Sequence, residues 1–344
     1  MSRSGSWFGV VVLASAAGAG ALFLISFLSG ADVVREPFEG NCTPVSGIAG
    51  PEDAQIDAYS RRAYVASLDR ESGEQRGGVF LFSLDDPLSD SWRDRTGGAP
   101  TRLDPVGISL YEGGGLRRLF VANAASKTVE LYEIEDGGDL RYLETFRERR
   151  LTSPSDVVGV GPRSFYVSND VEPGRDSLLG AAHFLFRAGS GRILHFDGVS
   201  WRIAADGLRF AGGLATSLDG LRLYATETAA ASLLVYDRDL ETGNLTLAKT
   251  VPLGAAADNI NIDPTGTLWI GAQPKTLLTP SKKNSAAGSL VFGYDDMREV
   301  PSKPRLIFTD SGTTIAAATV AARLGPTLLV GSPAGNRFLI CELS

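Results

Sequence analysis

The sequence predicts an all-β fold, a six-bladed β-propeller spanning residues 32–344 that follows an apolar N-terminal segment, residues 1–31. Three observations carry this prediction: six similar strand-like segments, frequent turn residues, and a single pair of cysteines at opposite ends of the repeated region. The 344 residues include 40 glycines and 17 prolines, a content typical of many short strands joined by tight turns.

Six segments share one pattern, in which a large apolar residue precedes a β-branched or small residue and then small or polar ones. The intervals between the large residues run from 45 residues (Tyr224 to Trp269) to 60 (Trp269 to Leu329), which suits a four-stranded blade with variable loops. The runs alternate with period two, whereas a helical solenoid would need apolar residues at i, i+3, i+4 and i+7. The six large residues are Tyr64, Phe120, Tyr166, Tyr224, Trp269 and Leu329.

The two cysteines, Cys42 and Cys341, lie before the first repeat and after the last one. A bridge between them would tie the two ends of a circular array together, and disulfides persist in oxidising compartments. We therefore predict a Cys42–Cys341 disulfide. The alternative is a pair of free thiols, since cysteine also serves as a small buried hydrophobe.

The N-terminal segment carries no charge from Ser4 to Ala31, and residues 8–28 are almost wholly apolar. At 1.5 Å per residue, such a helix covers about 31 Å, the thickness of a hydrocarbon core. Secretory signals have shorter apolar regions, although the small residues at 14–21 suit cleavage. We expect an uncleaved signal-anchor that places the propeller outside the cytoplasm, with a secreted, cleaved form as the alternative.

Several common site types are missing from the sequence. There is no Gly-x-Ser-x-Gly elbow, no zinc-type cluster and no phosphate-binding loop, and a net charge of −7 without basic blocks argues against a nucleic-acid partner. The chain has two histidines. We expect His195 to pack on a blade face and His183 to pack in an apolar insertion over the channel mouth, with His183 as a replacement base as the alternative.

Pairs of oxygen-bearing residues stand where strands of different blades begin. Equivalent positions of successive blades converge on the central channel of a propeller, and carboxylate and amide oxygens gathered there suit Ca²⁺, which takes six to eight such ligands. The alternative is that these residues only form turns. The pairs are Glu52-Asp53, Ser155-Asp156, Asn169-Asp170 and Asp258-Asn259.

From Asn41 to Leu343 the chain resembles the paraoxonase/arylesterase family, calcium-dependent lactonases and esterases with a six-bladed propeller and a hydrophobic N-terminal segment. The resemblance rests on short motifs along the whole chain. These are Asn41-Cys42, Glu52-Asp53, residues 104–109, 127–131, 155–162, 165–170 and 258–260, and the closing Cys341-Glu-Leu.

The resemblance implies two calcium ions, a solvent-facing catalytic one and a buried structural one. The residues that match the catalytic ion's ligands are Glu52, Asp258 and Asn259, and those that match the structural ion's ligands are Asp53, Asp156 and the backbone carbonyl of Ile108. All the structural ligands are kept, so this ion is the more secure of the two.

The chain also departs from the family pattern at the catalytic centre. Two asparagine ligands are replaced by Ser155, a weak neutral oxygen ligand, and Gly212. The catalytic histidine is replaced by Val106, its partner falls near Ala124, and a further pocket histidine becomes Gln273. Three of five protein ligands to the catalytic ion remain, and the histidine base is gone.

Two functions follow from this pattern. In the first, the chain is a calcium-dependent hydrolase of carboxylic esters, aryl esters or lactones, with reduced or shifted activity. Calcium polarises the carbonyl, and Glu52 or Asp258 deprotonates a water. In the second, it is a catalytically degenerate, calcium-stabilised propeller that binds a ligand or a protein.

Overall fold

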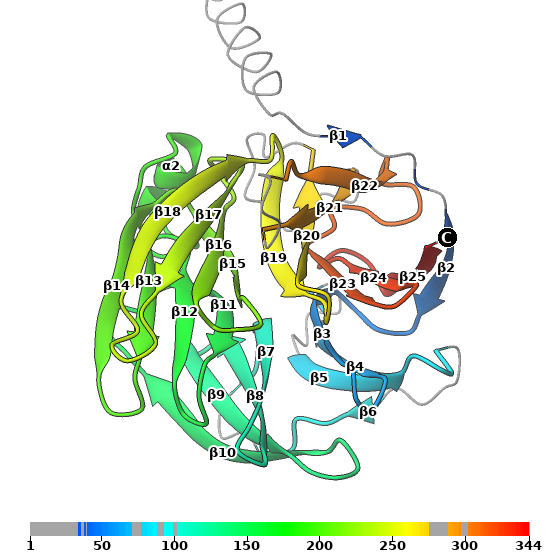
Figure 1. The fold of residues 1–344 in the computed structure, drawn as a ribbon, viewed down its shortest axis with the longest axis horizontal. Coiled ribbons are helices and arrows are strands. Elements are labelled where there is room, and N and C mark those ends of the chain that lie inside the picture. Colours follow the sequence, from blue (N-terminus) through cyan, green and yellow to red (C-terminus); the bar gives the residue numbers. More distant parts are fainter. Residues whose placement is uncertain are drawn as a thin grey trace, which may run out of the picture.

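A computed structural model of the chain describes residues 34–35, 38, 40–70, 77–87, 93–98, 102–274, 288–296 and 302–343. Within these residues the strands form six antiparallel sheets around a common axis (Figure 1), which confirms the six-bladed propeller. The segment 1–31 lies outside the described residues. In the part of the chain that is described, no helix has the length and apolar character needed to cross a membrane.

Each blade has four strands. Blade 1 contains β3 (Pro51–Asp57), β4 (Arg62–Leu68), β5 (Gly77–Ser83) and β6 (Arg93–Asp94), and blade 2 contains β7 (Pro105–Gly113), β8 (Leu116–Asn123), β9 (Thr128–Ile134) and β10 (Leu140–Arg147). Blade 3 contains β11 (Pro154–Gly159), β12 (Phe165–Asn169), β13 (Gly191–Phe196) and β14 (Trp201–Leu208), and blade 4 contains β15 (Ala211–Thr216), β16 (Arg222–Glu227), β17 (Ser232–Arg238) and β18 (Leu245–Pro252).

Blades 5 and 6 depart from simple chain order. Blade 5 contains β19 (Ala256–Ile262), β20 (Thr267–Gln273), β21 (Ser289–Asp295) and β22 (Arg305–Asp310), and the short β1 (Val34–Arg35) pairs in parallel with β22. Blade 6 contains β23 (Val320–Leu324), β24 (Thr327–Gly331) and β25 (Arg337–Leu343), and its outermost strand is the N-terminal β2 (Gly40–Ser46). One helix that the sequence analysis did not predict, α2 (Leu178–Leu185), lies between β12 and β13.

The ring is closed by β2, which pairs antiparallel with β25 (Figure 1). In this register Cys42 lies directly opposite Cys341, and the two are joined by a disulfide. The predicted bridge is therefore confirmed, and the free-thiol alternative is wrong.

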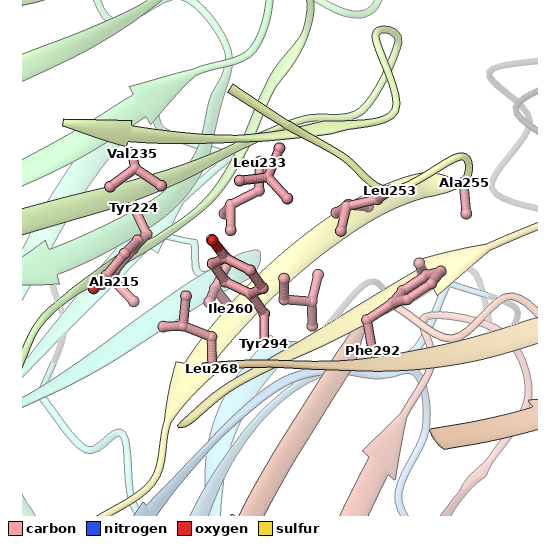
Figure 2. Packing of buried hydrophobic residues seen from close by; sticks show 14 residues of the cluster. Ala215, Tyr224, Leu233, Val235, Leu253, Ala255, Ile260, Leu268, Phe292 and Tyr294 are labelled. Carbon is pink, nitrogen blue, oxygen red and sulfur yellow. The ribbon is translucent and has the colours of Figure 1, made fainter. Parts of the chain in front are cut away.

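Hydrophobic clusters fill the six spaces between neighbouring blades. The large residues that marked the repeats all lie on the second strands of their blades and are buried. Figure 2 shows one such cluster, in which Tyr224 and Leu233 of blade 4 pack against Leu268 and Tyr294 of blade 5. Burial of apolar area at about 25 cal/mol per Å² is the main force that holds the blades together.

His195 lies on β13, as predicted for a packed residue. Its ring stacks on Tyr166 with 4.2 Å between centroids, and its side chain is buried. Burial, followed by the charges of Arg202 and Arg238, lowers the pKa of His195 to about 4. The unfolded chain would titrate this histidine near pH 6.5, so between the two values the unfolded state binds more protons.

Stability is therefore expected to fall as the pH drops from about 6.5 towards 4, and His195 contributes part of that fall. In a His195→Gln variant, this part of the pH dependence should be absent. The difference in unfolding free energy between wild type and variant should change by about 1–3 kcal/mol across the window. Urea unfolding at pH 4.5, 6 and 8 measures it, and a difference that is the same at all three values would contradict the assignment.

Candidate active site and metal centre

The inner group consists of Asp53 on β3, Asp156 on β11 and Ile108 on β7, three innermost strands. Asp53 and Asp156 are only 1% and 2% exposed. Asp53 accepts hydrogen bonds from the backbone N–H groups of Ala54 (2.8 Å) and Ile108 (2.7 Å). Asp156 accepts them from Val157 (2.7 Å) and Leu214 (2.6 Å). The two carboxylates thus join blade 1 to blade 2 and blade 3 to blade 4.

Charge in the inner group is uncompensated by arginine or lysine. Burial, with added repulsion from Asp258 and Glu52, raises the pKa of Asp53 to about 8. Burial and the charge of Asp53 raise the pKa of Asp156 well above its usual range. Neither carboxylate has an ion pair among the described residues. Two acidic side chains held this way fit a divalent cation, because each oxygen keeps a lone pair beyond its backbone hydrogen bond.

The backbone of β7 completes this group. The N–H of Ile108 donates to Asp53, so the backbone of this residue lies against the inner carboxylates. A Cβ at Gly107 would lie 2.3 Å from an oxygen of Asp156, so only glycine leaves room for that carboxylate. The structure therefore brings together all three residues predicted for the structural ion.

The outer group consists of Glu52, Ser155, Asp258 and Asn259, which lie next to the inner group at the starts of β3, β11 and β19. The amide of Asn259 donates to the backbone carbonyl of Glu52 (3.1 Å), while its own oxygen, Oδ1, is buried and has no hydrogen-bond partner among the described residues. Burial, followed by the charge of Glu52, raises the pKa of Asp258 to about 7. An unpartnered amide oxygen beside two carboxylates fits a cation ligand set.

Two arginines in this region were not predicted from the sequence. Arg70, which follows β4, pairs with Glu52 and with Asp104 (3.3 Å to Oδ1). Arg175, in the connection between β12 and α2, pairs with the buried Asp170. Single arginines in loops usually lie in solvent, so no sequence pattern predicts a role for either one.

These arginines set the charge balance of the outer group. Four carboxyl groups, those of Glu52, Asp104, Asp170 and Asp258, lie around the two guanidinium groups of Arg70 and Arg175. A divalent cation would add positive charge to a region where acidic groups outnumber these arginines. In the part of the chain that the structure describes, no three His, Cys, Asp or Glu side chains form a metal cluster by themselves. The donor set is instead carboxylate, amide, hydroxyl and carbonyl oxygen, which favours Ca²⁺ over zinc.

A pocket of 480 Å³, called here the mouth pocket, is lined by Pro154, the residue before Ser155, and by Asp104, which shares Arg70 with Glu52. Its walls come from blades 1, 2 and 3 and from the connection before α2. The lining residues used below are Leu68, Arg102, Asp104, Ala124, Lys127, Ser153 and Arg175. A cavity of this size suits a small organic molecule.

Comparison with known proteins identifies the family of the chain. The sequence model of the family described as arylesterase matches residues 67–343. The chain belongs to the arylesterase family. It is 29% identical over 318 residues to serum paraoxonase/arylesterase 1 of Rattus norvegicus, covering 88% of this chain and 89% of the relative. It is 30% identical over 319 residues to serum paraoxonase/arylesterase 2 of Gallus gallus, with the same coverage.

Solved structures support the arylesterase-family fold at lower identity. A putative gluconolactonase superposes with a TM-score of 0.57 at 16% identity, covering 91% of this chain and 94% of its own. Regucalcin from Agrobacterium tumefaciens, described as a calcium-binding protein, superposes with a TM-score of 0.54 at 15% identity, covering 90% and 96%. These likenesses concern the fold.

Val106, Ala124, Gly212 and Gln273, which we expect to replace family site residues, have the following surroundings in the structure. Val106 is 2% exposed in the cluster between blades 2 and 3, and Ala124 packs against that cluster while lining the mouth pocket. A Cβ at Gly212 would lie 2.6 Å from the hydroxyl of Thr226, so that hydroxyl fills space beside the glycine. Gln273 ends β20 and is partly exposed.

Asn169-Asp170 and His183 belong to neither the inner nor the outer group. Asn169-Asp170 stands at the end of β12, the second strand of blade 3, and not at the entrance to a blade, where we expected it. Both are buried, and the amide oxygen of Asn169 accepts the N–H groups of Thr152 and Ser153, which is a turn role. His183 lies on α2, where its Nδ1 is 2.8 Å from the hydroxyl of Ser190.

Proposed function

We propose that the chain hydrolyses carboxylic esters, either aryl esters or lactones, in a calcium-dependent reaction. Membership of the arylesterase family supports the reaction class. The observation that carries the proposal is the outer group itself. It gathers oxygen ligands from three blades, and Pro154, the residue before Ser155, lines a pocket of 480 Å³.

The residues divide into two ligand sets. Asp53, Asp156 and the carbonyl of Ile108 would hold an inner calcium, and Glu52, Ser155, Asp258 and Asn259 would hold an outer one. The outer calcium, when bound, supplies a Lewis acid for the ester carbonyl. Asp258, with its pKa near 7, is the side chain best suited to accept a proton from water, and Glu52 is the second candidate.

The location of the chain is a further part of the proposal. A disulfide between Cys42 and Cys341 supports an oxidising, extracytoplasmic compartment. Attachment to a membrane through residues 1–31, as a signal-anchor or with cleavage and secretion, stays a prediction. The proposed partners are therefore a small ester or lactone and a membrane, with no nucleic acid.

The test is a panel of aryl esters and lactones assayed with calcium and after complete chelation. Esters with good leaving groups are expected to react fastest, since they demand least of the attacking water, and chelation should abolish turnover. A His183→Ala variant should retain activity within about twofold, because its imidazole hydrogen-bonds Ser190 on the α2 connection. Loss of activity in His183→Ala, with retention in Glu52→Gln, would contradict the site.

The alternative function is a catalytically degenerate propeller that binds a ligand or protein. One observation favours it: Val106 and Ala124 pack with apolar side chains where the family resemblance implies a histidine pair. If no member of the panel reacts while calcium still raises the melting temperature, this alternative replaces the hydrolase.

Removal of one inner carboxylate should weaken the response to calcium. Asp156→Asn keeps the shape but loses a charged ligand and one acceptor for the N–H of Val157 or Leu214. We expect a loss of about 2–4 kcal/mol in calcium buffer. Thermal unfolding across a calcium titration measures it. Asp57→Asn, another buried carboxylate on β3, is the matched control, and should lower stability without changing the calcium-induced shift in Tm.

A further inference from the structure

Arg175 is held in place on several sides. Its Nε donates to Oδ2 of Asp170 (2.6 Å), and Nη2 pairs with the same oxygen. Its guanidinium lies over the ring of Phe210, 5.5 Å from the centroid, and its backbone N–H donates to the hydroxyl of Ser153 (3.4 Å). A guanidinium fixed by an ion pair and a ring face loses little freedom when it binds a further ligand.

The other edge of this guanidinium is available. Nη1 has no partner among the described residues, the side chain is 23% exposed, and Arg175 lines the mouth pocket. Burial lowers the pKa of Arg175, but the nearby carboxylates, Asp170 first and then Glu52, outweigh it and leave the pKa raised. Arg175 is therefore a permanent cation that presents donor groups to the pocket.

Further cations line the pocket from blade 2. Lys127 stands in the turn between β8 and β9 and is exposed, and Arg102 precedes β7. Two acidic residues also belong to the lining, but Asp104 pairs with Arg70, and Asp176 is exposed to solvent. The rest of the wall includes apolar residues such as Leu68 and Ala124. An apolar wall with cations on two sides is suited to a small organic anion.

We propose that the mouth pocket selects substrates that carry a carboxylate, which Arg175 binds through its Nη1 edge while Lys127 attracts it from the neighbouring blade 2. The proposal rests on the proposed ester hydrolysis and makes Arg175 its specificity-determining residue. Neutral esters would enter the same pocket without this contact, so the effect concerns KM more than kcat.

The test compares 4-acetoxybenzoate with phenyl acetate, and measures benzoate binding by calorimetry. Loss of a charge-assisted hydrogen bond should reduce the preference for the carboxylated ester about 10- to 100-fold in Arg175→Gln, mainly through KM. Lys127→Gln should reduce it severalfold. Arg175→Lys should restore part of it. Benzoate should bind the wild type and lose affinity in the same order.

The matched control is Arg61→Gln. Arg61 is also an exposed cation in a turn with left-handed backbone (φ 53° against 56° for Lys127), but it lies between β3 and β4, at the opposite end of the blades. It should leave both readouts unchanged. If Arg175→Gln loses its fold because Asp170 loses its ion-pair partner, the substrate preference and benzoate affinity of Lys127→Gln test the proposal.

The outcomes separate this inference from the proposed function. Ester hydrolysis with the same substrate preference in all variants, and benzoate affinity unchanged by them, would overturn the carboxylate pocket and leave the hydrolase standing. Benzoate binding that depends on Arg175, in a protein that hydrolyses no ester, would support the pocket and end the proposed reaction.

Discussion

Asp258→Asn is expected to lower kcat/KM for a reactive aryl ester by about 10²–10³-fold in saturating calcium. The change removes a negative ligand of the outer group and the side chain whose pKa lies near 7, the best placed acceptor for a proton from water. Glu52→Gln should act similarly, because Glu52 supplies the second carboxylate and also anchors Arg70. Initial-rate kinetics across substrate concentrations measures both.

The pH dependence offers a check on the same variants. Without histidines at 106 and 124, the acid limb should follow a carboxylate. Calcium binding favours the ionised form, so raising the calcium concentration should move the limb to lower pH, away from the ion-free value of about 7 for Asp258. Full activity in Asp258→Asn, or an acid limb that ignores calcium, would show that the outer group is not the catalytic centre.

Cys341→Ser is expected to destabilise the propeller by up to about 5–6 kcal/mol, because the bridge closes a loop of 299 residues and restricts the unfolded chain. The melting temperature should fall by on the order of 10 °C. Thermal and urea unfolding of this variant, of Cys42→Ser and of the double variant give the comparison. The double variant should match the singles, since the lost constraint is the same.

The β2–β25 ladder limits that loss. It pairs seven residues of each strand, from Gly40 opposite Leu343 to Ser46 opposite Arg337, and remains when the sulfurs are removed. An unchanged midpoint in the double variant would mean that this ladder alone closes the ring.

Much of the fold was predictable because its signals are local. Alternation of period two, together with turn residues, predicted strands at Tyr64, Tyr166 and Trp269, and all three lie buried on strands. The disulfide followed from circular topology rather than from local pattern. The gathering of Asp53 and Asp156 was predictable from their equivalent positions in different blades, whereas the choice of these two with Ile108 as one group came from the family resemblance.

The remainder depends on contacts that no local pattern encodes. Arg70 and Arg175 are single residues in loops, and only the closed ring brings them to Glu52 and Asp170. Helix α2 has eight residues, too few for a clear period of 3.6, and exposes Leu178 and Leu179 to solvent. Strand β1 has only two residues and no strand signal of its own, so its pairing with β22 was not predictable.

The position of β2 in the last blade has a consequence for biosynthesis. Its partner β25 lies nearly 300 residues later, since the paired cysteines are 299 residues apart. At about 5–20 residues per second, translation needs roughly 15–60 s to supply that partner. Throughout this time β2 is an edge strand with open backbone donors and acceptors, and a chaperone or translocation machinery must keep it from pairing with a neighbouring nascent chain. Strand β2, made early, is thus among the last strands to pair.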